Sequence, residues 1–266
     1  MKFPIGFVDK QETGKIEKEL MNQMGSMPVK SLVQVFFPKR SQTLTYYNDQ
    51  FDLKQGDFVF VEGKLEGSLG IVRNVCKNFK IKVSDYKKVI SVADTSIHGQ
   101  LYMAGSHFIC FDSAVLPYKK IRTWYLPPAN EEEYVTGSDD SVFSLDKLSE
   151  MNVSQEIWER AQNYYTSNRV RYLCVDTGHG RAIVEGENIY EVEFDFADGD
   201  IRNLTCTCPC GYTCKHEVAT MMQLRETLEN ISQHYGDLHH DYFATITKSE
   251  FFYYIVENQS TGCFTL

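Results

Sequence analysis

The chain has 266 residues, 42% of them hydrophobic and 24% charged, which is an ordinary composition for a globular protein. No apolar run approaches the length of a membrane-spanning helix, and the first residues lack the apolar core of a signal peptide. Four of the eight cysteines are scattered and four lie close together. We therefore expect no membrane partner and a reducing, cytoplasmic setting, in which thiols bind metal instead of forming disulfides.

Charge divides the chain into two unlike halves. Residues 1–130 carry 18 lysines and arginines against 12 acidic residues, whereas residues 131–266 carry 9 against 24. An acidic field opposes the approach of a phosphate backbone. The charge of the second half therefore argues against nucleic-acid binding there. The alternative is that the acidic surface only keeps the protein soluble.

The first half is expected to be β-rich. Residues 1–29 fit a short amphipathic helix or a solvated arm equally well. Residues 30–128 alternate β-branched and aromatic residues between turn signals, and we expect strands as far as the segment before Pro127. The segment 30–75 contains a G-D-F-V-F-V strand followed by G-I-V. It resembles small bacterial β-barrel domains of the PSP1 type, or the amino-terminal module of the primosomal helicase. This resemblance implies a barrel-like domain and no particular site residues.

Basic residues lie among aromatic residues in the second part of this region. Such a pattern is typical of a groove for single-stranded nucleic acid, where cations meet phosphates and rings meet bases. It equally fits a half-buried sheet with solvated lysines on its outer face. The candidate nucleic-acid contacts are Lys80, Lys82, Lys87, Lys88, Lys119, Lys120 and Arg122.

Residues 129–150 are acidic and bear proline, serine and glycine, so we expect a linker that marks a domain boundary. The following domain, residues 151–266, begins with a helix from about Ile157 to Asn168 and continues in strands. A hairpin turns at residues 197–199, because Tyr190, Val192 and Phe194 alternate with acidic residues before it. The carboxyl end, from Tyr242 onward, is predicted to form one or two more strands.

Five soft metal ligands follow the hairpin within eleven residues: Cys206, Cys208, Cys210, Cys214 and His216. Zinc prefers thiolate and imidazole and takes four ligands in a tetrahedron. Apolar residues at helical spacing follow His216, so Cys214 and His216 are expected at the start of a helix. A metal would then tie a hairpin to a helix that share little other surface. The alternative is a disulfide group or a set of unliganded thiols.

The arrangement C-x-C, spacer, C-x-H and helix, over residues of about 190–228, is similar to the SWIM zinc finger. The resemblance implies Zn²⁺ and assigns Cys206, Cys208, Cys214 and His216 as its ligands. Cys210 is left unassigned, so we favour a free thiol there over a replacement for Cys208. SWIM fingers are associated with DNA binding or protein–protein contact.

The predicted fold class is α+β, with a barrel-like β-rich first half and a zinc-bound hairpin plus helix in the second. The predicted function is a non-enzymatic zinc protein that binds nucleic acid, another protein or both. A protein scaffold without nucleic-acid contact is the first alternative. A zinc-dependent enzyme is the second: Glu217 could serve as acid or base, but an acidic residue is also expected at a helix start for the dipole alone.

Overall fold

The computed structural model describes residues 30–128, 141–238, 241–257 and 262–266, and it confirms the α+β class. The expected helix or arm at residues 1–29 lies outside the described residues. Within the described ranges, no helix is both long and apolar enough to cross a membrane.

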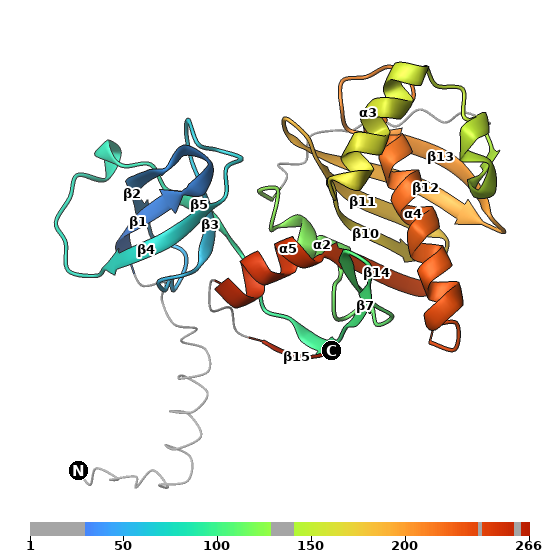
Figure 1. Ribbon diagram of the computed structural model, residues 1–266. Helices are drawn as coiled ribbons and strands as arrows, with labels where there is room; N and C mark the ends of the chain where they lie inside the picture. Colours follow the sequence, from blue (N-terminus) through green and yellow to red (C-terminus); the bar gives the residue numbers. More distant parts are fainter. Residues whose placement is uncertain (1–29, 129–140, 239–240, 258–261) are drawn as a thin grey trace, which may run out of the picture.

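A five-stranded antiparallel sheet forms the first unit, in the order β2-β1-β4-β3-β5 (Figure 1). Its edges meet at one isolated parallel bridge between Tyr47 and Lys88, so the sheet curls without closing into a barrel. The elements are β1 (Ser31–Phe37), η1 (Pro38–Arg40), β2 (Gln42–Asn48), β3 (Phe58–Val61), β4 (Gly70–Cys76), η2 (Val83–Asp85) and β5 (Val89–Ala93).

An eight-stranded sheet forms the second unit, in the order β7-β8-β14-β10-β11-β12-β13-β9. The predicted hairpin is confirmed as β12 and β13, with Asp198 and Gly199 in the left-handed conformation that its tight turn requires. The strands are β7 (Tyr102–Ala104), β8 (His107–Cys110), β9 (Phe143–Ser144), β10 (Val170–Asp176), β11 (His179–Glu185), β12 (Ile189–Ala197), β13 (Asp200–Cys206) and β14 (Tyr242–Thr247).

Helices cover both faces of this larger sheet (Figure 1). On one face, α3 and α4 bury side chains against β10, β11 and β12 in a shared core. On the other face, α2 and α5 pack in a core that also takes in Phe58 and Ile71 of the first sheet. The helical elements are α2 (Tyr118–Arg122), η3 (Leu145–Glu150), α3 (Gln155–Thr166), α4 (Lys215–His234), α5 (Lys248–Phe251) and the π-helix η4 (Phe252–Glu257).

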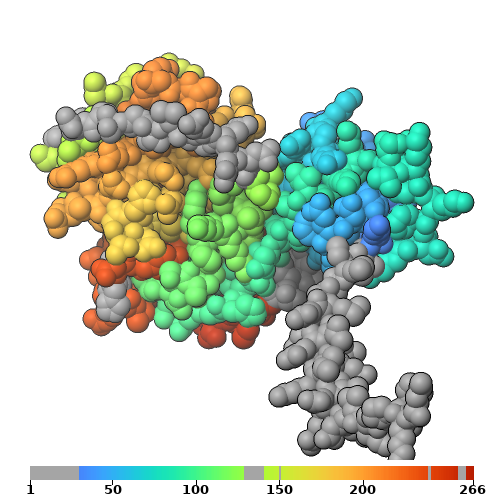
Figure 2. Space-filling view, turned by 180° about the vertical axis from the view of Figure 1, so that it is seen from behind, coloured from blue at the N-terminus to red at the C-terminus, as the bar shows by residue number. Residues whose placement is uncertain are grey.

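The sheets divide the chain at a different place from the predicted linker. β8 pairs with β14, so residues 102–110 belong to the sheet of the second half. β9 pairs with β13, and Leu145 and Leu148 are buried in the core, so part of the acidic 129–150 segment is integral to the fold. Figure 2 shows the first sheet, in blue to cyan, as a lobe beside the rest of the molecule.

One strand prediction is wrong, and the strands predicted at the carboxyl end are confirmed as β14 and β15 with helical turns between them. The segment before Pro127 forms α2 and a following turn, because Ile121, Trp124 and Tyr125 bury together at spacings of three and four residues. The carboxyl end forms β14 as expected, but Thr247 then caps α5 by accepting a hydrogen bond from the Glu250 backbone N–H. A third, two-stranded sheet pairs β6 (His98–Gln100) in parallel with β15 (Cys263–Thr265).

One buried histidine should make stability depend on pH. His107 on β8 is 2% exposed, and its Nε2 donates to the carbonyl oxygen of Val170 at 3.2 Å. Burial lowers the pKa of His107 to about 4. At pH values between 4 and 6.5 the unfolded chain takes up a proton that the folded chain refuses, so the free energy of unfolding falls as the pH falls.

We expect His107→Gln, which keeps the donor to Val170, to remove about 2 kcal/mol of the stability loss between pH 7 and pH 5. Urea unfolding of both proteins across this range measures the difference. His98→Gln, at an exposed position, is the control and should leave the pH profile unchanged. If the free energy of unfolding changes with pH in the same way for the wild type and for His107→Gln, then His107 does not make stability depend on pH.

Candidate metal centre

Three sulfurs and one ring nitrogen converge where the hairpin meets the long helix. The ligand atoms of Cys206, Cys208, Cys214 and His216 all lie within 4.8 Å of one another. His216 Nδ1 lies 3.8 Å from the Cys206 sulfur and 3.6 Å from the Cys214 sulfur. This Cys₃His cluster could hold a metal ion, and its four residues are those assigned from the sequence pattern.

The hairpin and its following turn supply two of the sulfurs. Cys206 is the last residue of β13, and its sulfur accepts a hydrogen bond from the Cys208 backbone N–H at 3.4 Å. Such N–H donors stabilise negative charge on a sulfur. Cys210 is exposed and outside the cluster, which agrees with its assignment as a free thiol.

The start of α4 supplies the other two ligands. Cys214 is the N-cap residue, and its backbone N–H donates to the Glu217 carboxylate at 2.7 Å. This capping box fixes the first helical turn and hence the direction of the His216 ring. Glu217 is therefore occupied in holding the helix start, and burial raises its pKa to about 6.

Helix α4 is also held by packing of the apolar residues that the sequence places at helical spacing, and this face packs on the sheet that contains the hairpin. Val218, Met221 and Leu224 are fully buried against the sheet and α3. The expectation that hairpin and helix share little surface is therefore wrong. The metal-binding residues sit at the end of an extensive apolar contact, so a metal would organise the loop and the first helical turn more than the whole unit.

The electrostatics of the cluster are unfavourable for three thiolates unless a cation compensates them. A hydrogen bond with the Cys206 thiol, together with burial, raises the pKa of Cys214, and burial raises the pKa of Cys208 to about 11. Burial and the neighbouring Lys215 lower the pKa of His216 to about 4, which leaves the imidazole neutral and able to act as a ligand. A divalent cation supplies the charge that such thiolates need.

Aromatic rings enclose His216 on the side away from the sulfurs. Tyr190 stacks on the imidazole at 4.3 Å between ring centres, and Tyr164 meets it edge-on at 5.3 Å. The Nε2 atom is buried with no hydrogen-bond partner. These neighbours were not predicted. The pairing of Val192 with Cys206 gives a register that brings Tyr190 beside residues 206–214, the segment between the first and third cysteine ligands, which we call the metal loop.

The candidate nucleic-acid contacts come from two parts of the fold, and three of the seven are paired. Three of them are engaged in ion pairs: Lys88 with Asp49 at 2.8 Å, Lys120 with Asp94 at 2.9 Å and Arg122 with Glu191 at 2.6 Å. The other four, Lys80, Lys82, Lys87 and Lys119, are exposed. Lys119 lies on α2, whereas the remaining three lie in the loop between β4 and β5.

No protein-family model, no curated protein and no solved structure matches this chain. Function is therefore inferred from the geometry of the cluster and from the chemistry of its donors.

Metal content tests the ligand set. Purified wild-type protein should carry one metal ion per chain, and Cys206→Ser or Cys214→Ser should lose it, because hydroxyls replace thiolates poorly. Cys210→Ser is the matched control and should retain the full content, as measured by elemental analysis. Loss of metal from Cys210→Ser would show that the exposed thiol is a ligand after all.

Gly186, in the turn before β12, tests the packing around His216. A Cβ atom at this position would lie 2.9 Å from Tyr190 Cε2 and 3.3 Å from His216 Nε2. We expect Gly186→Ala to displace the imidazole and to weaken metal binding, at a cost of about 1–3 kcal/mol.

Gly211, in the metal loop itself, provides the control, because a Cβ there meets nothing within 4 Å. Competition with a chromophoric chelator would measure both affinities. Equal affinities for Gly186→Ala and Gly211→Ala would contradict the role assigned to the ring enclosure.

Proposed function

We propose that the cluster is a structural zinc site of the SWIM type in a non-enzymatic binding protein. The observation that carries the proposal is the donor spacing. Zinc bonds of about 2.3 Å to sulfur and 2.0 Å to nitrogen place S and N about 3.5 Å apart in a tetrahedron. The two sulfur-to-Nδ1 distances of 3.6 and 3.8 Å are close to this value.

The closed donor set favours a structural role over catalysis. Catalytic zinc keeps three protein ligands and an open position for water. Here four protein donors converge, and the carboxylate of Glu217 is engaged with the backbone of Cys214. A carboxylate–histidine pair, His179 with Asp195 at 3.0 Å, is partly exposed on the sheet, where Asp195 also accepts a hydrogen bond from Asn203.

Nucleic acid is the partner that we propose for the first sheet. Residues 30–93 carry 11 basic and 6 acidic side chains. In the β4–β5 loop, Lys80, Lys82 and Lys87 are exposed and have no carboxylate partner within the described residues. Phe79 anchors this loop by an edge-on contact with Tyr47 at 6.2 Å and remains half-exposed, so a ring is present among the cations.

A protein partner is the second candidate, and the metal loop favours it. Tyr212 lies between Cys208 and Cys214 and is 70% exposed. An exposed tyrosine on a loop that a metal holds in place is a suitable anchor for a protein contact. Acidic residues outnumber basic ones by 19 to 9 in residues 141–266, so a basic partner surface is expected there.

Binding to single-stranded DNA across a salt series tests the nucleic-acid role. The affinity should fall steeply with salt, and Lys80→Gln with Lys82→Gln should reduce the log–log slope by about 1.4. The double variant Lys54→Gln with Lys64→Gln removes two exposed lysines of the same sheet and should change the slope less. Absence of binding at low salt would discard nucleic acid and leave the protein partner.

A further inference from the structure

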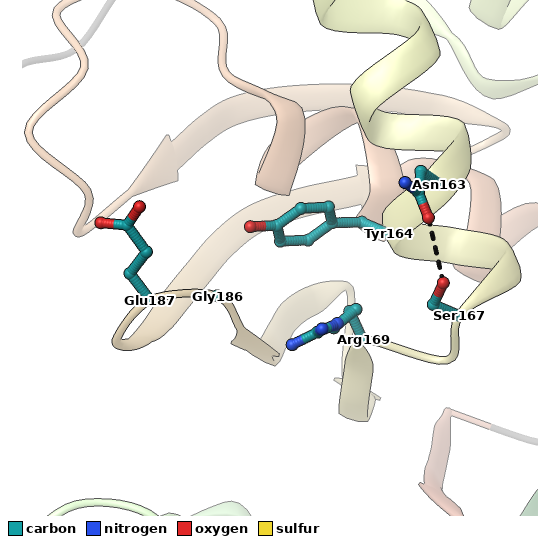
Figure 3. A pocket seen from close by; sticks show the side chains of 6 residues that line it. All are labelled: Asn163, Tyr164, Ser167, Arg169, Gly186 and Glu187. Carbon is teal, nitrogen blue, oxygen red and sulfur yellow. Dashed lines mark hydrogen bonds between the residues drawn. The ribbon is translucent and has the colours of Figure 1, made fainter.

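A small hollow lies beside the metal centre, at the carboxyl-terminal end of α3 (Figure 3). Its volume is about 240 Å³, which suits a small group better than a drug-sized ligand. The residues that line it are Asn163, Tyr164, Ser167, Arg169, Gly186 and Glu187.

The walls of the hollow are fixed by backbone hydrogen bonds. The Arg169 N–H donates to the Tyr164 carbonyl at 2.9 Å, and the Arg169 carbonyl accepts from the Glu185 N–H at 2.8 Å. The Gly186 N–H closes the next turn by donating to the Asn188 carbonyl at 2.8 Å. The end of α3 and the β11–β12 turn are thus joined, and the hollow exists before any ligand arrives.

Two cations contact the ring of Tyr164, and one of them, Arg169, lines the hollow. The Arg169 guanidinium lies 5.9 Å and the Lys215 ammonium 4.9 Å from the centre of the Tyr164 ring. No described carboxylate pairs with either of them, Glu187 included. Four arginines of this acidic half do have such partners, namely Arg160, Arg171, Arg181 and Arg225, whereas Arg202 and Lys248 have no carboxylate partner among the described residues.

A second, independent observation concerns His216, which lies next to Gly186 in the wall of the hollow. His216 is 4% exposed, and its Nε2 atom has no hydrogen-bond partner. A Cβ on Gly186, which lines the hollow, would be 3.3 Å from this nitrogen and 3.2 Å from the Tyr164 hydroxyl oxygen. When Nδ1 faces the sulfurs, Nε2 carries the proton, so an unused donor lies next to Gly186, which lines the hollow.

We propose that this hollow is a binding site for a small oxyanion, either a carboxylate or a phosphate group. Arg169 supplies the planar fork that matches two anion oxygens, and Lys215 adds a second positive charge against the same ring. The exposed Glu187 at the rim repels a further negative charge, and so it favours a ligand with one anionic group. The site does not depend on which metal the cluster holds.

Titration of the full-length, metal-loaded protein with inorganic phosphate, and separately with acetate, tests the site. Ionic strength is held constant with chloride, and amide shifts of Arg169, Gly186 and Glu187 are followed by NMR. We expect saturable shifts with at least one of the two anions. Saturation by phosphate alone or by acetate alone identifies the source, and saturation by both supports a general oxyanion site.

Variants separate this site from general charge effects. Arg169→Gln should weaken anion binding by about tenfold or more, Arg169→Lys should restore part of it, and Glu187→Gln should tighten it. Arg202→Gln, an exposed cation on β13, is the matched control and should bind as the wild type does. Each variant should retain the wild-type metal content. The proposal is overturned if neither anion gives saturable shifts, or if Arg169→Gln leaves them unchanged.

Discussion

The crowding of three sulfurs and an imidazole within 4.8 Å is the constraint on which the centre of the second unit depends. Buried thiols this close resist ionisation, as the raised pKa values of Cys208 and Cys214 show. A cation would resolve the conflict, because it would stabilise all three thiolates at once and use the neutral imidazole as its fourth donor. Cys206 and Cys208 come from the hairpin and its following turn, and Cys214 and His216 come from the helix start, so a single ion would order the loop between them.

A metal ion would not be the sole interaction that holds the β12–β13 hairpin against α4. Helix α4 is anchored along its length by apolar contacts with the sheet and α3, and its first turn is closed by the capping box of Cys214 and Glu217. The rings of Tyr164 and Tyr190 fix the orientation of His216 from behind. The conformation of the metal loop would therefore depend on the ion, whereas α4 and the sheet are held by packing. Tyr212 on this loop is exposed and accessible to a partner.

Local sequence patterns predicted the parts of the site that are local in the chain. Local spacing indicated the hairpin and the helix after His216, and it offered five candidate ligands between them. The resemblance to the SWIM finger selected the four that lie together in the structure. The pairing of strands that lie far apart in the sequence could not be predicted from local patterns. β8 joins the sheet beside β14, about 130 residues away, and no periodicity reveals such a partner. The helices α2 and α5 carry aromatic residues that favour strands, and tertiary burial overrides that preference. Ion pairing of Lys88, Lys120 and Arg122 likewise depends on the fold.

Hydrogen exchange before and after removal of the metal with a chelator tests whether a bound ion orders this junction. Removal should give faster exchange for residues of about 204–220, which comprise the metal loop and the first turn of α4. The strands β10, β11 and β14 should keep their protection, because apolar packing holds them. Unchanged exchange around Cys206 and Cys214, or equal loss of protection through all of residues 141–257, would contradict this role of the ion.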